Sequence, residues 1–308
     1  LCVSKFLILD MKKYILTLLL ALSYVSFSIA EEVNDTTKRW KIGGNTSFTF
    51  NQISFHNWAA GGKNSMAGTF LFKTFANYKS KKVTWDNSLD LGYGLTKYKD
   101  EDYQKSEDKM NLSSLFGYDA YKAKWYYSAL LDFKSQFAKG YKYSNNDTTL
   151  VSKAFSPAYI NISIGMQYKP NDVFSFYLSP LTGRMTIVAD TLLATGYGLD
   201  AGEKVRAEYG AYAKILINKS NLVKNVDYYL RADFFSNLCE SPEHIDCDIE
   251  TGFNFKVNEF LTALIKFNLL FDDDIKHKET YFDESGKKLT RERGARLQCK
   301  ELFGFGLA

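Results

Sequence analysis

The sequence predicts an all-β protein, a transmembrane antiparallel up-and-down β-barrel of about twelve strands. Three observations lead there: apolar and polar residues alternate repeatedly, the connections alternate between short and long, and aromatic residues mark the ends of several segments. Aromatic residues make up 16% of the 308 residues and there are only 4 Pro, a balance that favours strands. Mean hydropathy is negative and nothing after residue 30 suits a spanning helix, but alternation hides a barrel's apolar residues from such averages.

The alternation is clearest between Ala158 and Tyr168. Ala158, Ile160 and Ile162 begin one face of this segment, while Tyr159 and Asn161 begin the other. A period of two places successive side chains on opposite faces of a sheet. The segment is therefore predicted to be a strand with one apolar face and one polar face.

Twelve segments follow this pattern, and several exceed ten residues. Tilted strands that cross a bilayer need about 9–11 residues, whereas strands of soluble proteins average about 5–6. In chain order the predicted strands are Trp40–Asn51, Ser65–Lys79, Val83–Lys97, Lys109–Ala120, Lys124–Gly140, Ala158–Lys169, Val173–Ala189, Val205–Asn218, Val226–Phe235, Ile249–Val257, Leu261–Asp272 and Ala295–Ala308.

The connections between these segments alternate in length. The short ones are Ser80–Lys82, Tyr121–Ala123, Pro170–Asp172 and Asn258–Phe260, with a medium link at Lys219–Asn225. The long ones are Gln52–Asn64, Tyr98–Asp108, Tyr141–Pro157, Asp190–Lys204, Ser236–Asp248 and Asp273–Gly294. Tight periplasmic turns and extended outer loops are typical of outer-membrane barrels. An even strand number would place both ends of the barrel on the periplasmic side.

Aromatic residues gather at the short-turn ends. Three of the four Trp residues open predicted strands there, and Trp58 in the first long loop is the exception. Amphipathic rings settle at membrane interfaces. The sequence therefore predicts a periplasmic aromatic girdle formed by Trp40, Tyr78, Trp85, Trp125, Tyr168 and Tyr228.

Alternation assigns the charged residues to the lumen, because an Arg or Lys facing lipid costs about 2–4 kcal/mol at the bilayer midplane. The predicted lumen-lining residues are Asp86, Asp90, Asp132, Lys134, Arg206, Glu208, Asp227, Arg231, Asp233, Glu250, Lys266, Arg296 and Lys300. Two interpretations stay open: a lattice of ion pairs that fills a narrow barrel, or a polar pathway for a small solute. Glu301 does not fit, since it alternates with Leu297, Cys299 and Phe303 on the lipid side; a β-bulge could re-aim it.

The amino-terminal residues resemble an export signal. Lys12 and Lys13 follow Met11, an apolar core follows them, and Ser28-Ile29-Ala30 is a small-x-small cleavage site. We expect residues 1–10 to be upstream sequence, 11–30 a cleaved signal peptide, 31–39 a short periplasmic segment and 40–308 the barrel. The expected location is the bacterial outer membrane, with its lipid and assembly machinery as partners. The mature charge is only +2, which gives no reason to expect nucleic acid.

Candidate chemistry is sparse, and we assign no catalytic residue, cofactor or metal. Cys239 and Cys247 lie in one loop and could pair in an oxidising compartment. The run Asp272–Asp274 with His277 could activate water or bind a divalent cation, or it could be a solvated rim. The loop Phe55–Gly62 could constrict the barrel mouth or simply connect two strands.

Several motifs resemble those of a Bacteroidota outer-membrane β-barrel family known only as a domain of unknown function. The matching residues are Asn57–Gly62, Leu178–Arg184 continued through Thr186–Val188 to Asp190, Arg206-x-Glu208-x-Gly210-x-Tyr212, Asp272–Ile275 and Gln298-x-Lys300-Glu301. The resemblance spans nearly the whole mature chain and implies an outer-membrane barrel, but no activity and no catalytic residue. Such barrels usually end in an aromatic residue, whereas this sequence ends Gly306-Leu307-Ala308, so we expect it to be cut short.

Three functional hypotheses remain. The leading one is a narrow channel or binding barrel for a small polar solute, because both charge signs are predicted in the lumen. The second is an outer-membrane hydrolase at the extracellular rim, and the third is a structural barrel whose loops bind a partner. Whether the protein is an enzyme stays undecided, with the sequence leaning against it.

Overall fold

The computed structural model describes residues 39–54, 63–99, 101–120, 123–144, 147–273, 276–282 and 288–307. The expectations for residues 1–38, including the signal peptide, and for the loop Phe55–Gly62 with Trp58 lie outside these residues. Within the described ranges, no helix has the length and apolar character needed to span a membrane.

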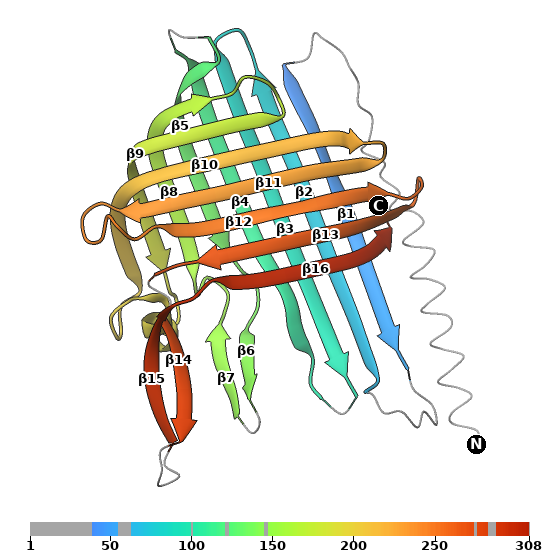
Figure 1. Cartoon of the computed structure of the whole chain (residues 1–308), viewed down its shortest axis with the longest axis vertical. Helices are drawn as coiled ribbons and strands as arrows, with labels where there is room; N and C mark the ends of the chain where they lie inside the picture. Colours follow the sequence, from blue (N-terminus) through green and yellow to red (C-terminus); the bar gives the residue numbers. More distant parts are fainter. Residues whose placement is uncertain are drawn as a thin grey trace. The chain divides into compact units, whose positions relative to one another are not determined.

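Twelve strands form a closed antiparallel up-and-down barrel, which confirms the predicted fold class and strand number (Figure 1). Each barrel strand pairs with the barrel strands that precede and follow it along the chain. The last barrel strand pairs with the first and closes the sheet. The barrel strands are β1 (Trp40–Ile53), β2 (Ser65–Lys79), β3 (Val83–Tyr98), β4 (Gln104–Asp119), β5 (Trp125–Ser135), β8 (Ala158–Tyr168), β9 (Phe174–Ile187), β10 (Val205–Val223), β11 (Val226–Asn237), β12 (Asp246–Lys256), β13 (Leu261–Phe271) and β16 (Gln298–Leu307).

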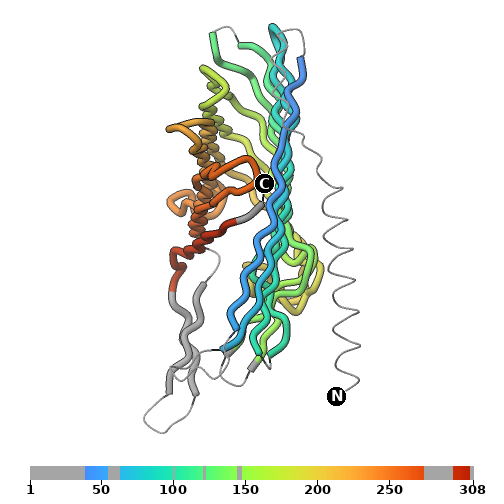
Figure 2. The backbone as a smooth tube through the Cα atoms, turned by 90° about the vertical axis from the view of Figure 1, so that its right-hand side faces the viewer, coloured from blue at the N-terminus to red at the C-terminus, as the bar shows by residue number. Residues whose placement is uncertain are grey.

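The barrel has two walls whose strands run in different directions. Strands β9 to β13 and β16 cross the front of Figure 1 at a steep angle to β1–β4 behind them. Figure 2 shows β1–β4 as one wall and β11–β13 within the facing wall. Twisted strands that tilt strongly produce this crossing when a sheet closes on itself.

The seam between the two ends of the sheet is narrow. Strands β1 and β16 pair at Phe48 and Leu307, whereas β16 pairs with β13 from Leu307 to Gln298 without a register shift. Glu301 therefore keeps its place opposite Phe267 and lies exposed on the outer face. The bulge considered for Glu301 is not present in this pairing.

The long connections contain structure that alternation did not predict. A hairpin of β6 (Gly140–Ser144) and β7 (Asp147–Ser152) follows β5, and a second hairpin of β14 (Lys276–Phe282) and β15 (Lys288–Ala295) follows β13. Between β9 and β10 lies the 3₁₀-helix η1 (Thr191–Tyr197). These elements project beyond the barrel wall at the long-loop end (Figure 1).

The loop around η1 has a small core of its own. Asp190 caps the helix by accepting a hydrogen bond from the Leu192 backbone N–H, and the buried residues are Val188, Leu193, Ala194 and Leu199. Burial raises the pKa of Tyr197 to about 12, and its hydroxyl donates to the Val151 carbonyl at 2.8 Å. This loop is thereby fastened to the β6–β7 hairpin.

Several of the approximate strand bounds differ from the structure, and three of these differences have a clear local reason. The strand predicted over Lys124–Gly140 ends at Ser135, because the Asp108 carboxylate accepts the backbone N–H groups of Phe137 and Ala138 and turns the chain away. The strand predicted over Val205–Asn218 continues to Val223, because a register shift after Lys219 lets it pair to the end of the hairpin. The last strand begins at Gln298 instead of Ala295, since Ala295 still belongs to β15.

A pair of register shifts changes which side chains of β9 face inward. Before the shift the buried residues are Ser175, Tyr177 and Ser179, at odd-numbered positions. After the shift they are Thr182 and Thr186, at even-numbered positions. Gly165 on β8 permits this, because a Cβ there would lie 2.1 Å from the carbonyl oxygen of Leu178. The shift carries Arg184 onto the inner face of the barrel.

Candidate functional site

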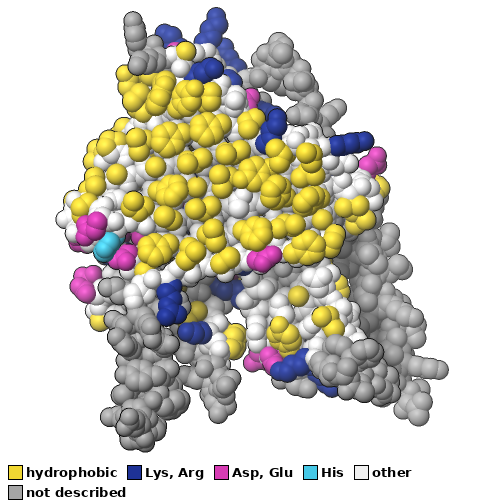
Figure 3. Space-filling view, viewed as in Figure 1, with side chains coloured by type: hydrophobic (Ala, Val, Ile, Leu, Met, Phe, Trp, Pro, Cys, Tyr) yellow, Lys and Arg dark blue, Asp and Glu magenta, His cyan; other side chains and the backbone are white. Residues whose placement is uncertain are grey.

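The outer surface of the barrel is apolar. Large exposed side chains on seven of the barrel strands include Ile42, Phe48, Phe70, Leu131, Ile162, Ile164, Leu178, Leu181, Tyr209, Phe303 and Phe305. Figure 3 shows this apolar surface continuing across the front strands with few charged side chains. Apolar patches of this extent on soluble monomers are uncommon, so the surface requires an apolar environment or a partner.

Aromatic side chains cluster at the short-turn ends of the strands. The ring of Trp40 lies 5.2 Å from Tyr78 and 5.8 Å from Trp85, centroid to centroid. Trp125 lies 5.1 Å from Tyr168, and Tyr228 lies 5.0 Å from Phe253. The structure therefore brings the six predicted girdle residues together in three groups at this end of the barrel.

The strand register places charged and polar residues side by side on the inner face. Asp132, Asn161, Arg184 and Glu208 are successive partners across β5, β8, β9 and β10. A second row runs Arg231, Glu250, Asn268 and Lys300 across β11, β12, β13 and β16, its partners again set by the register. Each row combines carboxylate acceptors, cationic donors and one amide, so that buried polar groups have possible hydrogen-bond partners beside them.

Glu250 is the centre of one ion-pair network. Its carboxylate lies 2.8 Å from the Lys109 ammonium, 3.3 Å from Lys73 and 3.5 Å from Lys266. Lys73 and Lys109 lie on the opposite wall, on β2 and β4, so these contacts cross the barrel interior. Asp90 joins the network through Lys109, at 2.6 Å.

Tyr212 joins a second network. Its hydroxyl donates to Asp233 at 2.7 Å and lies 3.0 Å from Asp132. Asp132 also pairs with Lys214 at 2.8 Å, and Asp233 pairs with Lys134 at 2.7 Å. Lys134 contacts Asp248 as well, at 2.7 Å, so β5 and β12 are joined across the interior.

The remaining predicted lumen residues have distinct places. Lys300 pairs with Glu107 at 2.8 Å, and Arg206 pairs with Glu208 at 3.1 Å. Near the short-turn end, Asp86 pairs with Lys169 and Asp227 pairs with Lys256. Arg296 lies exposed in the link before β16, outside the last strand.

Side chains fill the interior beneath these networks. Leu115, Leu130, Tyr177, Tyr212 and Phe235 form a buried cluster, each no more than 6% exposed. Below this cluster, toward the short-turn end, Gln167 is fully buried and donates to Ser175 at 2.8 Å. Strands β4, β5 and β9 to β11 thus enclose a packed region at this level.

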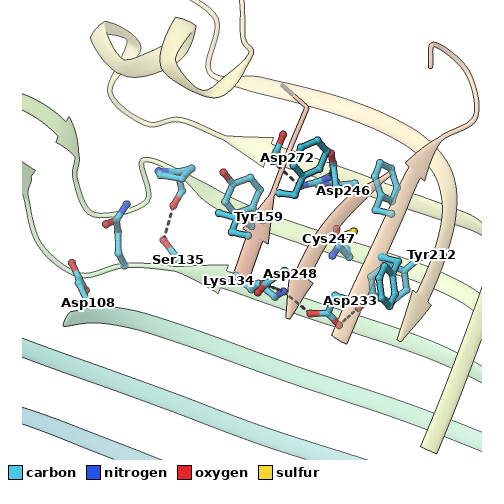
Figure 4. Close-up of a pocket in the computed structure, with 18 residues that line it drawn as sticks. Asp108, Lys134, Ser135, Tyr159, Tyr212, Asp233, Asp246, Cys247, Asp248 and Asp272 are labelled. Atoms are coloured by element: carbon cyan, nitrogen blue, oxygen red, sulfur yellow. Dashed lines mark hydrogen bonds and ion pairs between the residues drawn. The ribbon is translucent and has the colours of Figure 1, made fainter. Parts of the chain in front are cut away.

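A cavity of about 290 Å³ lies above this packed layer, where the strands meet the long loops (Figure 4). Its walls come from β4, β5 and β8 to β13. Tyr159, Tyr212 and Phe235 supply rings to the lining. Charged groups are supplied by Asp108, Lys134, Arg184, Asp233, Asp246, Asp248 and Asp272. The volume is at the lower end of the range for ligand pockets, which suits a small solute.

Arg184 is fixed in the cavity wall by charge and by aromatic contacts. It hydrogen-bonds Asp246 and lies 3.6 Å from Asp272. Its guanidinium carbon lies 4.9 Å from the centroid of the Phe235 ring and 5.6 Å from that of Tyr159. A planar guanidinium held on so many sides has little freedom to move toward a ligand.

The predicted acidic rim is divided between two environments. Asp272 is buried in the cavity wall beside Arg184, whereas Asp273 lies outside, with its carboxylate 2.9 Å from His244 Nδ1. The side chains of Asp274 and His277 lie outside the described residues. Within the described part of the chain, no group of three or more His, Cys, Asp or Glu residues is arranged to hold a metal ion.

Cys239 and Cys247 lie at either side of the β11–β12 loop, and both thiols are free in the structure. Cys299 is also free and exposed on β16. The pairing of Cys239 with Cys247 stays a prediction.

Several charged residues in or beside the cavity were not among the predicted lumen residues. Arg184 was hidden by the register shift in β9, and Asp246 and Asp248 were placed in a loop because β12 was begun too late. Asp108 and Lys105 belong to the start of β4, also placed in a loop, and they pair at 2.8 Å. Extending the alternation Asp246, Asp248, Glu250 backward along the chain could have found the first two.

Comparison with known proteins gives little functional information. A family model described as a protein of unknown function, DUF3078, matches residues 50–141, from the end of β1 into β6. No curated protein matches the chain. Over residues 50–141, therefore, this chain is similar to a family whose function is itself unknown.

Proposed function

We propose that this protein is an outer-membrane β-barrel of a Bacteroidota-type bacterium, exported through a cleaved signal peptide and inserted by the assembly machinery. It binds a small polar solute in the cavity at its long-loop mouth. The observation that carries this proposal is the distribution of side chains: apolar residues cover the outside and ion pairs fill the inside. A soluble protein has the opposite distribution, because its apolar core avoids water.

The packed interior favours a binding barrel over a channel. A solute that enters the mouth meets the Tyr212 and Phe235 side chains, which line the cavity and also belong to the buried cluster beneath it. Passage from the cavity past β4, β5 and β9 to β11 would require this cluster to separate. The buried cluster therefore closes the inner end of the cavity on this side.

The membrane location can be tested with two matched substitutions of exposed aliphatic residues. Ile162 on β8 is 54% exposed and Leu192 on η1 is 88% exposed. Ile162→Arg should destabilise the folded barrel by roughly 2–4 kcal/mol in lipid bilayers, because the charge would face hydrocarbon. Leu192→Arg should have no measurable effect, since Leu192 lies in a loop. The measurement is urea unfolding in phosphatidylcholine vesicles, followed by heat-modifiable migration on a gel.

Equal stability of the two variants would contradict the proposal. In a water-soluble barrel both residues face solvent, so both substitutions should be tolerated. The comparison depends on the environment of the outer surface and not on the size or exposure of the residues.

A further inference from the structure

Every short turn of the barrel carries a Lys residue. The five turns connect β2 to β3, β4 to β5, β8 to β9, β10 to β11 and β12 to β13. Lys lies within four of these turns and immediately before the fifth, at Lys81, Lys82, Lys124, Lys169, Lys224 and Lys256. Short turns favour Gly, Asn and Asp, and Lys124 even has a positive φ of 70°. The turn conformation therefore does not account for the lysines.

Backbone hydrogen bonds join these turns into one continuous edge of the barrel. Between neighbouring turns or strand ends, an N–H group donates to a carbonyl at 2.7–2.9 Å; the four donor–acceptor pairs are Asp119 to Lys82, Lys169 to Lys124, Asn218 to Val173 and Lys256 to Asn225. The side chains of the turns are thus presented together at one end of the barrel. In Figure 3, Lys and Arg side chains stand along the upper and right-hand edges, where the short turns lie in Figure 1.

Cations outnumber carboxylates at this end. The described residues of the short turns and the adjoining strand ends include ten Lys and Arg but five Asp and Glu. We call the ten cations the basic rim: Arg39, Lys41, Lys79, Lys81, Lys82, Lys124, Lys169, Lys219, Lys224 and Lys256. Cations still exceed acids when every charge of residues 31–38 and 121–122, outside the described residues, is added from the sequence. The excess therefore does not depend on any single ion pair.

Five exposed lysines of the basic rim have no ion pair with a described carboxylate. Three other members of the rim are paired: Lys79 with Asp172, Lys169 with Asp86 and Lys256 with Asp227. The exposed lysines without such a pair are Lys81, Lys82, Lys124, Lys219 and Lys224. They come from the β2–β3, β4–β5 and β10–β11 connections, so they are distributed around the end of the barrel.

The aromatic clusters of the short-turn end lie beside the basic rim. Lys219 is the cross-strand partner of Tyr228, and the Arg39 guanidinium donates to the Tyr78 hydroxyl at 3.4 Å. Amphipathic rings settle at the boundary between hydrocarbon and headgroups, and a Lys side chain extends its ammonium group toward the polar side. In the membrane location proposed above, the basic rim therefore lies at the level of the lipid headgroups.

We propose that the basic rim binds the phosphate groups of anionic phospholipids in the leaflet at the short-turn end. An ammonium group favours a headgroup with net negative charge over a zwitterionic one, whose own cation opposes its approach. The neighbouring rings and the apolar outer wall favour a phosphate that is attached to acyl chains over a free phosphate ion. This inference rests on the proposed membrane location and adds the class of lipid that the barrel prefers.

Quenching of Trp fluorescence by brominated lipids tests this inference, because Trp40, Trp85 and Trp125 lie at the short-turn end. Trp58→Phe leaves these three as the only reporters. The full-length barrel with this substitution is folded into vesicles of phosphatidylcholine and phosphatidylglycerol at roughly 3:1, with an equal mole fraction of brominated chains on one lipid or the other. Quenching should indicate about a threefold or greater preference for phosphatidylglycerol. Sodium chloride at about 1 M should abolish the preference by screening.

Two variants of equal charge change locate the preference. The rim variant combines Lys81→Gln, Lys82→Gln, Lys219→Gln and Lys224→Gln. The control replaces four exposed lysines at the long-loop end that likewise have no ion pair with a described carboxylate: Lys99→Gln, Lys139→Gln, Lys142→Gln and Lys204→Gln. The rim variant should lose the preference and the control should keep it. Equal loss in both variants would overturn the assignment to the basic rim.

The remaining outcomes separate this inference from the proposed function. Equal quenching by the two brominated lipids overturns the lipid preference and leaves a membrane barrel in place. Quenching by neither lipid, in a barrel that migrates heat-modifiably, contradicts the membrane location and the lipid preference with it. Loss of the preference in phosphate buffer, but not in sodium chloride of equal moderate ionic strength, would overturn the inference in favour of a free phosphate ion.

Discussion

Single residues join opposite walls of this barrel. Glu250 is 3% exposed at its side chain, and its partners Lys73 and Lys109 come from strands far away in the sequence. Burying a carboxylate is tolerable only when cations and hydrogen bonds surround it. Glu250 therefore holds together three cations that would otherwise repel one another.

Removal of that one charge should be costly. Glu250→Gln leaves Lys73, Lys109 and Lys266 close together without their shared counter-ion, and we expect a loss of about 3–5 kcal/mol in the free energy of unfolding. Glu301→Gln is the matched control, since Glu301 is exposed on the outer face and should show no loss. Urea unfolding in micelles measures both. A similar small effect for the two variants would show that the network contributes no net stability.

At the scale of elements, a register shift decides what faces inward. Between Ser179 and Thr182, the shift in β9 changes the inward-facing residues from odd-numbered to even-numbered positions. The close approach of β8 and β9 at Gly165 accompanies this shift. Without the shift, Arg184 would face outward and the cavity would lose its guanidinium.

Gly165→Ala should therefore destabilise the barrel by roughly 1–3 kcal/mol, because the added methyl group meets the Leu178 carbonyl oxygen, a backbone atom that cannot simply rotate away. Gly196→Ala adds the same atom in η1, where nothing lies within 4 Å of it. The urea midpoints of the two variants give the comparison. Equal midpoints would mean that β8 and β9 can separate at no cost.

The same elements explain how far sequence could predict this structure. Alternation predicted all twelve barrel strands, because the inner and outer faces of each strand meet different surroundings. For Ser65–Lys79 both predicted ends agree with the structure. It failed where the period of two is interrupted, as in β9, and where a side chain ends a strand, as Asp108 does for β5. The cavity combines residues of eight strands, and the contact of Arg184 with Asp246 depends on closure of the whole sheet.

At the scale of the whole molecule, the packed interior makes a functional prediction. Leu130, Tyr177 and Gln167 are each no more than 2% exposed inside the barrel. The folded protein should therefore give no steady conductance steps in planar bilayers, although it inserts. Heat-modifiable migration of the same sample confirms that the barrel is folded. Regular steps of constant size would favour the channel hypothesis instead.

The charged rows on the inner face also favour the correct strand register during assembly. Because side chains alternate with a period of two, a strand that pairs one residue out of register turns its entire row toward the outer surface. For β5 that error would turn Asp132 and Lys134 outward and remove them from their partners on β10, β11 and β12. In the membrane location proposed above, the outward-facing Lys alone would cost a few kcal/mol. A misregistered intermediate is thus destabilised at its inner and its outer face. The ion pairs across the interior therefore favour the correct register even between strands that are not neighbours in the sheet.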